Sequence, residues 1–292
     1  METRQLEYFL AVAEELSFTR AAERVFAVQS TISAAITSLE RELGASLFER
    51  STKRVSLTDA GRALLPEARA AVESIDRVRS AVADTSAGIR GRLRVGIFTN
   101  LVAIDLPALL GDFHARHPLV DLQLAASPSG STGFVDDVAR GRVDVAFMGL
   151  PRHDLAPLHV FDLVTTEFVA ILPKGHRLAA ETTVRLADLV TEPFVDTPPG
   201  FGNRVVLERV LATRGLHRTV STAVSDLGDV PRYVGAGLGI AVLPEALRAN
   251  ASGAVVVPLD ERIEWTLSLV SRENPSPATS ALLALMRERL AP

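Results

Sequence analysis

The sequence predicts an α/β protein with an all-α winged helix-turn-helix domain at its N-terminus and a long linker helix between the two parts. Three patterns predict it: two short helices close together in residues 17–61, an apolar seam at helical spacing through residues 64–82, and short apolar strands alternating with amphipathic helices from residue 92 onward. We expect the helix-turn-helix domain over residues 1–57, the linker helix over 58–87 and the α/β domain over 88–292.

The helix-turn-helix prediction depends on two helical patterns of different character. The first has Phe18, Ala21, Ala22 and Val25 on one face. Its paired alanines let another helix approach closely. The second places its apolar residues at spacings of four, three and four, at Ile32, Ile36, Leu39 and Leu43. Its other face carries short side chains that can reach base edges in a DNA major groove. These candidate contacts are Gln29, Ser30, Thr31, Ser33, Ala34 and Thr37.

A short basic segment follows the second helix. Arg50, Lys53 and Arg54 lie between two apolar stretches typical of strands, which predicts a strand–turn–strand wing. Residues 1–60 carry seven Arg or Lys against nine Asp or Glu, and the whole chain has a net charge of −4. The basic footprint usual for DNA-binding domains is therefore missing. A locally basic wing can still lie along a phosphate backbone; a solvated hairpin turn is the alternative.

The linker helix is expected from residue 58 to about residue 86. Thr58 is a natural N-cap, and Pro66 falls inside the helix. One face repeats apolar residues at the spacing of a coiled-coil seam. Because a single helix cannot bury such a seam, we expect a second copy of the chain to cover it; packing on the chain's own domain is the alternative. The seam consists of Leu64, Ala68, Ala71, Ile75, Val78 and Val82.

The α/β part is predicted from its alternating elements. Strands are expected at 93–98, 120–125, 143–148, 168–172, 221–224 and 240–243, and helices at 103–116, 132–141, 204–214, 230–236 and 276–290. Repeated strand–helix–strand units predict a parallel sheet that is covered on both faces.

Residues 17–61 closely resemble the N-terminal domain of the LysR-type transcriptional regulators. The resemblance rests on the helix spacing, the paired alanines, the positions 29, 30 and 33, and the runs 39–40, 43–44, 47–48 and 57–61. Two positions depart from the family. Val28 stands where Ser or Thr often caps the recognition helix, and Ala34 stands where Arg is frequent. A helix cap and a phosphate or guanine contact must therefore come from elsewhere or be absent.

The rest of the chain resembles, at the level of its pattern, the effector-binding half of the same regulators. That resemblance implies a two-lobed fold similar to periplasmic ligand-binding proteins, in which the chain crosses between lobes twice. We place the crossings near residues 162–166 and 261–265. Lobe I then comprises about 92–162 and 266–292, and lobe II about 163–265.

A ligand site is expected beyond the carboxyl ends of the strands. Thr99, the strongest single candidate, and Asn100 follow a strand and precede a helix, whose N-terminal N–H groups can meet an anion. Loops after later strands supply further candidates, for which turn and capping chemistry is the alternative. These are Ser129, Ser131, Thr132, Gly149, Phe201 and Asn203.

Composition narrows the function. With no cysteine, disulfides, thiolate catalysis and cysteine metal sites are excluded, and the six histidines lack the spacing of a zinc site. We expect no enzyme, metal or cofactor. No apolar run approaches the ~18 residues that span a membrane, and the N-terminus lacks the apolar core of a signal peptide. We therefore expect a cytoplasmic protein without a membrane partner.

The resemblance implies a sequence-specific regulator of transcription. It would bind double-stranded promoter DNA as a homo-dimer or homo-tetramer and respond to a small-molecule effector, a metabolite, between its two lobes. A regulator without a ligand stays open, as does a solute-binding or enzymatic α/β protein with a fused helical module. Nothing in the sequence specifies the effector, the target genes, or activation against repression.

Overall fold

The computed structural model describes residues 1–50, 55–83, 88–98, 104–246 and 251–290. Contacts divide the chain into an N-terminal unit, essentially residues 1–89, and a C-terminal unit that holds the sheet. The N-terminal unit consists of α1 (Thr3–Glu15), α2 (Phe18–Arg24), α3 (Gln29–Leu43), β1 (Phe48–Arg50), β2 (Val55–Leu57) and α4 (Asp59–Ala83). Of these elements, α1 was not predicted from the sequence.

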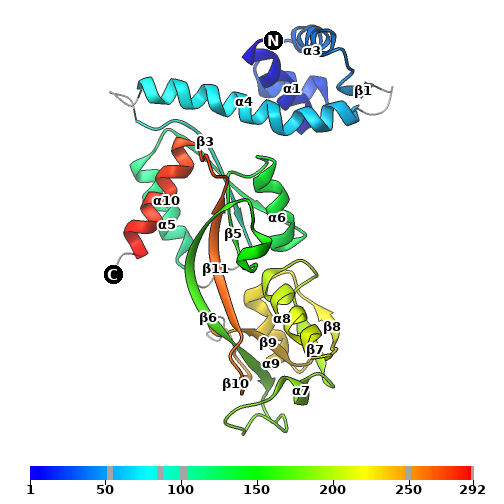
Figure 1. Cartoon of the computed structure of the whole chain (residues 1–292), viewed down its shortest axis with the longest axis vertical. Helices are drawn as coiled ribbons and strands as arrows, with labels where there is room; N and C mark the ends of the chain where they lie inside the picture. Colours follow the sequence, from blue (N-terminus) through cyan, green and yellow to red (C-terminus); the bar gives the residue numbers. More distant parts are fainter. Residues whose placement is uncertain (51–54, 84–87, 99–103, 247–250, 291–292) are drawn as a thin grey trace. The chain divides into compact units, whose positions relative to one another are not determined.

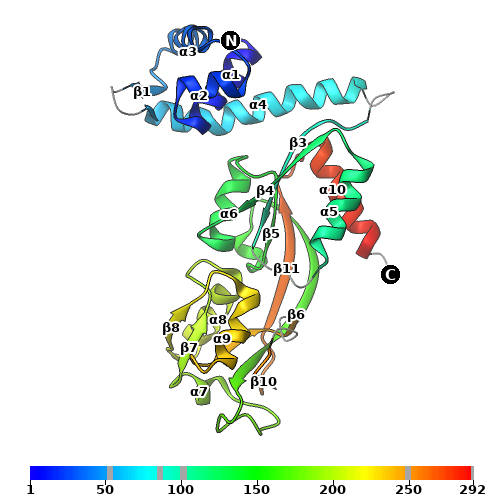
Figure 2. The same cartoon turned by 180° about the vertical axis from the view of Figure 1, so that it is seen from behind.

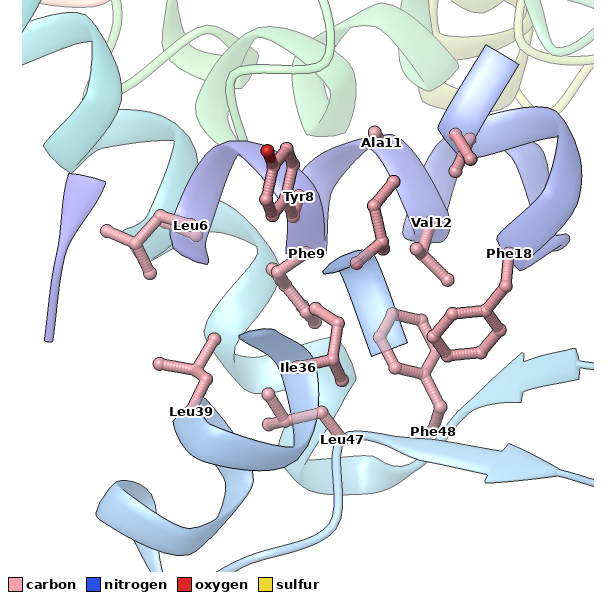
Figure 3. Packing of buried hydrophobic residues seen from close by; sticks show 14 residues of the cluster. Leu6, Tyr8, Phe9, Ala11, Val12, Phe18, Ile36, Leu39, Leu47 and Phe48 are labelled. Carbon is pink, nitrogen blue, oxygen red and sulfur yellow. The ribbon is translucent and has the colours of Figure 1, made fainter. Parts of the chain in front are cut away.

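The core of the N-terminal unit forms where α1, α2 and α3 meet the base of the wing (Figure 3). Phe48 of β1 packs its ring 5.5 Å from that of Phe9 and 5.7 Å from that of Phe18. Ile32, Ile36 and Leu39 are buried as the helical spacing predicts. Leu43, which has the same spacing, is 42% exposed at the last residue of α3, so the buried face ends at Leu39.

The wing joins α4 through a close backbone contact. Thr58 caps α4 as predicted, since its Oγ1 accepts a hydrogen bond of 3.0 Å from the Gly61 amide. Gly61 lies in the first turn of α4, where an added Cβ would be 2.2 Å from the carbonyl oxygen of Leu47. Only a residue without a Cβ fits this approach.

Replacing Gly61 with Ala is therefore expected to destabilise the N-terminal unit by about 1–3 kcal/mol through overpacking. The change is informative because Gly-to-Ala inside a helix usually stabilises, by about 0.5–1 kcal/mol. Gly111→Ala is the matched control, since Gly111 lies inside a helix with nothing within 4 Å of its missing Cβ. In urea titrations followed by far-UV circular dichroism, the unfolding midpoint should fall for Gly61→Ala and rise for Gly111→Ala. A raised midpoint for Gly61→Ala would contradict the close contact with the Leu47 carbonyl.

Half of the predicted seam is covered by the chain itself. Ala68 is 1% exposed within the core of the N-terminal unit, and Leu64 and Ala71 pack against that core beside α1. Assigning Ala68 to a surface for a second chain was therefore wrong, because α1, which the sequence analysis missed, occupies that side of α4. Further along, Ile75 is half-buried and Val78 is 65% exposed. These two positions and Val82 remain a predicted seam.

The C-terminal unit contains a mixed sheet of seven strands (Figure 1). The strand order is β10-β6-β11-β5-β3-β4, and β9 also pairs with β6. The strands are β3 (Gly91–Ile97), β4 (Val120–Ala126), β5 (Val145–Met148), β6 (His159–Pro173), β9 (Ala241–Pro244), β10 (Ala254–Pro258) and β11 (Glu264–Ser271). A separate parallel pair is formed by β7 (Pro193–Asp196) and β8 (Thr219–Ala223).

Helices pack around this sheet. They are α5 (Leu106–Arg116), α6 (Gly130–Ala139), α7 (Leu186–Leu189), α8 (Gly202–Thr213), α9 (Val230–Gly235) and α10 (Pro277–Leu290), with 3-10 turns η1 (Arg152–Asp154) and η2 (Leu227–Asp229). Both views place α5 beside α10 (Figure 1 and Figure 2). Arg116 of α5 pairs with Glu288 of α10 at 2.6 Å.

The prediction of a parallel sheet is correct only in part. Strand β3 pairs parallel with β4 and with β5, whereas every pair made by β6 or β11 is antiparallel. The chain leaves along β6 and returns along β11, so these strands must run in opposite directions. They lie side by side through the segments where the sequence places the crossings, with Thr166 opposite Trp265 and Asp162 opposite Ser268. Strands β7, β10 and β11 and most of the 15-residue β6 were not predicted from the sequence.

Candidate nucleic-acid interface and ligand cleft

The outward face of α3 carries the predicted DNA contacts. Gln29, Ser30, Thr31, Ala34 and Thr37 are exposed, and Ser33 is half-buried. Positions 29, 33 and 37 follow one another at one helical turn and thus share a face. Thr37 donates its hydroxyl proton to the carbonyl oxygen of Ser33 at 2.9 Å. Its Oγ1 is left with acceptor capacity, which suits an amino group on a base edge.

The start of α3 has no side-chain cap. Val28 occupies the N-cap position, and its carbonyl oxygen accepts from the Thr31 amide at 2.9 Å. The N-cap side chain therefore accepts from none of the first amides of the helix, and the positive end of the helix dipole can bind an anion such as a phosphate.

The wing is formed as predicted at its base. β1 and β2 pair antiparallel, with Arg50 opposite Val55. Lys53 and Arg54 lie outside the described residues, so the prediction that they contact phosphates stays a prediction.

In the C-terminal unit, three of the loops chosen from sequence meet. A Cβ added to Gly130 would lie 2.7 Å from the ring of Phe201, and one added to Gly202 would lie 2.4 Å from the carbonyl oxygen of Gly149. The Thr132 amide donates to the carbonyl oxygen of Gly200 at 3.1 Å. The loops after β4, β5 and β7 are therefore in direct contact.

The polar groups of these loops are largely engaged with one another. The Gly149 amide donates to Oγ of the buried Ser131 at 3.3 Å, and the Thr132 hydroxyl donates to the Ser129 carbonyl at 3.0 Å. Ser129 itself is exposed. The prediction that these residues share one mouth agrees with their positions, whereas the prediction that they contact an effector remains open.

Asn203 belongs to a buried polar cluster. Its Nδ2 donates to Asp196 Oδ1 at 2.9 Å, and its Oδ1 accepts from the Thr197 hydroxyl at 3.1 Å. Asp196 also pairs with Arg218, whose guanidinium lies 4.8 Å from the centre of the Phe194 ring. Both charged side chains are at most 3% exposed. Asn203 is thus held by buried hydrogen bonds to the end of β7 and the residue after it.

Thr99 and Asn100 were chosen because they follow a strand and precede a helix. The following helix, α5, begins at Leu106, and its N-cap is Asp105, whose Oδ1 accepts from the Ala108 amide at 3.0 Å. Thr99 and Asn100 lie outside the described residues.

Trp265 is the residue that sequence reasoning missed at this site. It lies on β11 and is 5% exposed. A Cβ added to Gly149 would lie 2.3 Å from its Nε1, so the indole lies directly against the loop after β5. Among the described residues this N–H has no hydrogen-bond partner. Two features of the sequence could have identified Trp265: it is the chain's single tryptophan, and it lies in a segment predicted to cross between the lobes.

An ion pair lies further along the crossing strands. Arg152 binds Asp162 at 2.7 Å, and the Ser268 hydroxyl donates to the same carboxylate at 2.8 Å. The hydrogen bond from Arg152 holds the pKa of the Asp162 carboxyl below its ordinary value, although partial burial acts in the opposite direction. Asp162 therefore carries a negative charge at neutral pH.

Comparison with known protein families shows which family has this architecture. The model of the bacterial regulatory helix-turn-helix protein of the lysR family matches residues 3–62, and the LysR substrate binding domain matches residues 86–291. The chain belongs to the LysR family.

Relatives of this LysR-family chain are transcriptional regulators. It is 41% identical over 244 residues to the HTH-type transcriptional regulator ShiR of Corynebacterium glutamicum (strain R), which covers 83% of this chain and 82% of that protein. It is 32% identical over 285 residues to the transcriptional dual regulator GltC of Bacillus subtilis (strain 168), which covers 96% and 94%. Full-length CbnR in complex with its target DNA matches with a TM-score of 0.61 and 26% identity, over 100% of both chains.

The LysR-family assignment confirms the fold class and the predicted class of function. The protein is a DNA-binding transcriptional regulator with a substrate-binding domain, and it is not an enzyme. In the described part of this LysR-type regulator, no helix is both long and apolar enough to cross a membrane.

Proposed function

We propose that this LysR-type regulator inserts α3 into the major groove of double-stranded promoter DNA, with the wing on the adjacent phosphates, and that a small metabolite bound in the cleft of the C-terminal unit controls this binding. The protein acts in the cytoplasm as a homo-dimer or homo-tetramer. The short polar face of α3 and its open N-terminus support the DNA contact. CbnR, a structural neighbour, was solved with DNA.

The observation that carries the effector proposal is the buried indole N–H of Trp265. A buried donor without an acceptor costs roughly 1–3 kcal/mol, so such a group marks a place where a water or a ligand belongs. The Ser131 hydroxyl lies against the same loop and can donate as well, because its oxygen accepts from Gly149. Two donors that both lie against Gly149 favour an effector with an acceptor oxygen, a carboxylate or a carbonyl.

The test uses the intact protein and a panel of carboxylate and carbonyl metabolites. An effector that binds the folded state alone raises the melting temperature and, at the cleft, changes the fluorescence of the single tryptophan. With the compound found in this way, Trp265→Phe keeps the aromatic body and removes the N–H. We expect its affinity to fall roughly ten- to a hundredfold, as for a lost hydrogen bond to a charged group, while binding to DNA without the effector is unchanged. Equal affinity would remove Trp265 from the site.

A regulator without a ligand is the second candidate. The contacts from Thr132 to Gly200 and from Gly130 to Phe201 support it, because the chain's own loops already contact one another at these positions. In that case no compound in the panel should change the melting temperature or the tryptophan fluorescence.

Oligomerisation is expected to depend on the part of α4 that the chain's own core does not cover. Ile75→Asp places a charge between paired helices and should raise the dissociation constant roughly a hundredfold or more. Ser74→Asp places the same charge one position off the seam, on an exposed residue, and is the control. Sedimentation velocity should show monomers of Ile75→Asp at concentrations where the parent and Ser74→Asp associate. An unchanged oligomer would exclude this seam as the main contact.

A further inference from the structure

The turn between α2 and α3 exposes an aromatic side chain completely. Phe26 is 99% exposed, the highest value among the large apolar residues of the described ranges, and its near neighbour Val28 is 68% exposed. Single exposed apolar residues are common on proteins. A phenyl ring with almost no contact to its own chain is unusual, because packing a Phe normally contributes much to stability.

The backbone conformation at position 26 is also unfavourable for a phenylalanine. Phe26 has φ +52°, in the left-handed region. The amide of Ala27 donates to the Ala22 carbonyl at 2.9 Å, and the Phe26 amide donates to the Glu23 carbonyl at 3.3 Å. These two bonds form the Schellman motif that ends α2, in which glycine is usual at the position of Phe26. A bulky residue is strained there, so Phe26 stabilises neither the turn nor the core.

The position of Phe26 indicates what its ring contacts. It lies three residues before Gln29, the first residue of α3, and beside the uncapped start of that helix. The exposed turn is therefore continuous with the face assigned to DNA. A helix that enters the major groove brings its preceding turn to the groove edge, where thymine methyl groups and deoxyribose carbons are the available apolar surface.

We propose that Phe26 is a DNA-contacting residue of this regulator, whose ring packs on the apolar surface of the duplex beside the start of α3. This role is additional to the polar readout by α3, and it rests on the assignment of α3 to the groove. Such a contact also explains how an acidic domain can bind DNA, because burial of the ring adds affinity that the few positive charges do not supply.

The test compares Phe26→Gly with the intact parent on a duplex selected from a random library by the full-length parent. Gly relieves the left-handed backbone, so its melting temperature should equal or exceed that of the parent. Its affinity for the selected duplex should fall roughly ten- to a hundredfold, as expected from losing the burial of a phenyl ring. Phe26→Leu should retain part of the affinity.

Leu16 provides the matched control. It also has a positive φ, +49°, and is 49% exposed, but it lies at the opposite end of α2. Leu16→Gly should therefore relieve the same kind of strain and leave the affinity for DNA unchanged. Ser33→Glu, tested in parallel, separates the role of Phe26 from that of α3. If both Ser33→Glu and Phe26→Gly bind DNA as the parent does, α3 does not enter the groove. If Phe26→Gly binds normally and Ser33→Glu does not, only the role of Phe26 is excluded.

Two arms identify the apolar surface on the duplex. Deoxyuridine in place of thymidine removes the methyl groups; if the ring contacts a methyl, this probe weakens the parent and not Phe26→Gly. If the ring contacts deoxyribose, Phe26→Gly weakens binding to selected and random duplexes equally, and deoxyuridine has no effect. Unchanged DNA affinity for Phe26→Gly overturns the proposal. If, in addition, sedimentation shows a changed oligomer, the ring belongs to a protein contact.

Discussion

Replacing Ser33 with Glu is expected to lower the affinity for the selected duplex about a thousandfold or more. Ser33 lies in the middle of the polar face of α3, between Gln29 and Thr37. A glutamate there adds bulk where the helix must approach base edges and a negative charge near phosphates. Specific binding usually exceeds non-specific binding by about 10³ or more, and this variant should lose that whole difference.

Ser280→Glu is the control for this variant. It makes the same substitution at an exposed helical position of the C-terminal unit, so the net charge changes equally. Fluorescence anisotropy with labelled duplex should show loss of binding for Ser33→Glu alone. Circular dichroism checks that the helices are retained. Specific binding by a folded Ser33→Glu protein would contradict the placement of α3 in the groove.

Replacing Asp196 with Ala is expected to destabilise the C-terminal unit by about 3–5 kcal/mol. Asp196 and Arg218 form an ion pair in which the side chains are 1% and 3% exposed. Removing one partner leaves the other charge buried without compensation. The amide of Thr197 and Nδ2 of Asn203 would also lose their shared acceptor, Asp196 Oδ1, now at 2.7 and 2.9 Å. Urea unfolding followed by the fluorescence of Trp265 reports on this unit specifically.

The double variant Asp196→Leu with Arg218→Met tests the cause. If an uncompensated charge is responsible, removing both partners should cost clearly less than the sum of the single replacements, because no buried charge remains. Some loss should persist, since the donors from Thr197 and Asn203 stay unpaired. If the losses of unfolding free energy were strictly additive, packing and not the ion pair would determine the destabilisation.

The local spacing of apolar and capping residues was sufficient to predict α3 and the start of α4 in the DNA-binding unit. The spacing of Ile32, Ile36 and Leu39 identified the buried face of α3, and the hydroxyl of Thr58 identified the start of α4. Both signals depend on neighbours within one or two helical turns, where backbone geometry alone decides which side chains share a face. The polar face of α3 followed from the same periodicity.

Periodicity does not show what covers an apolar face. Ala68 fits the heptad seam, but α1 covers it, and α1 was not anticipated. The start of a helix is equally hard to place: the pattern predicted this one from residue 103, whereas α5 begins at Leu106, after its N-cap Asp105. The sequence also suggested a uniformly parallel sheet, because it showed strand–helix alternation and not the return of the chain along β11.

The sequence by itself determined the family, the helix-turn-helix and the loops that meet in the C-terminal unit, because these depend on local periodicity and short motifs. The tertiary structure alone decided that Trp265 lies against Gly149, that Asp196 pairs with Arg218, and that nothing covers Phe26. Trp265 and Gly149 are brought together by the antiparallel pairing of β11 with β5. Contacts of this kind join segments far apart in the chain, so no local spacing encodes them.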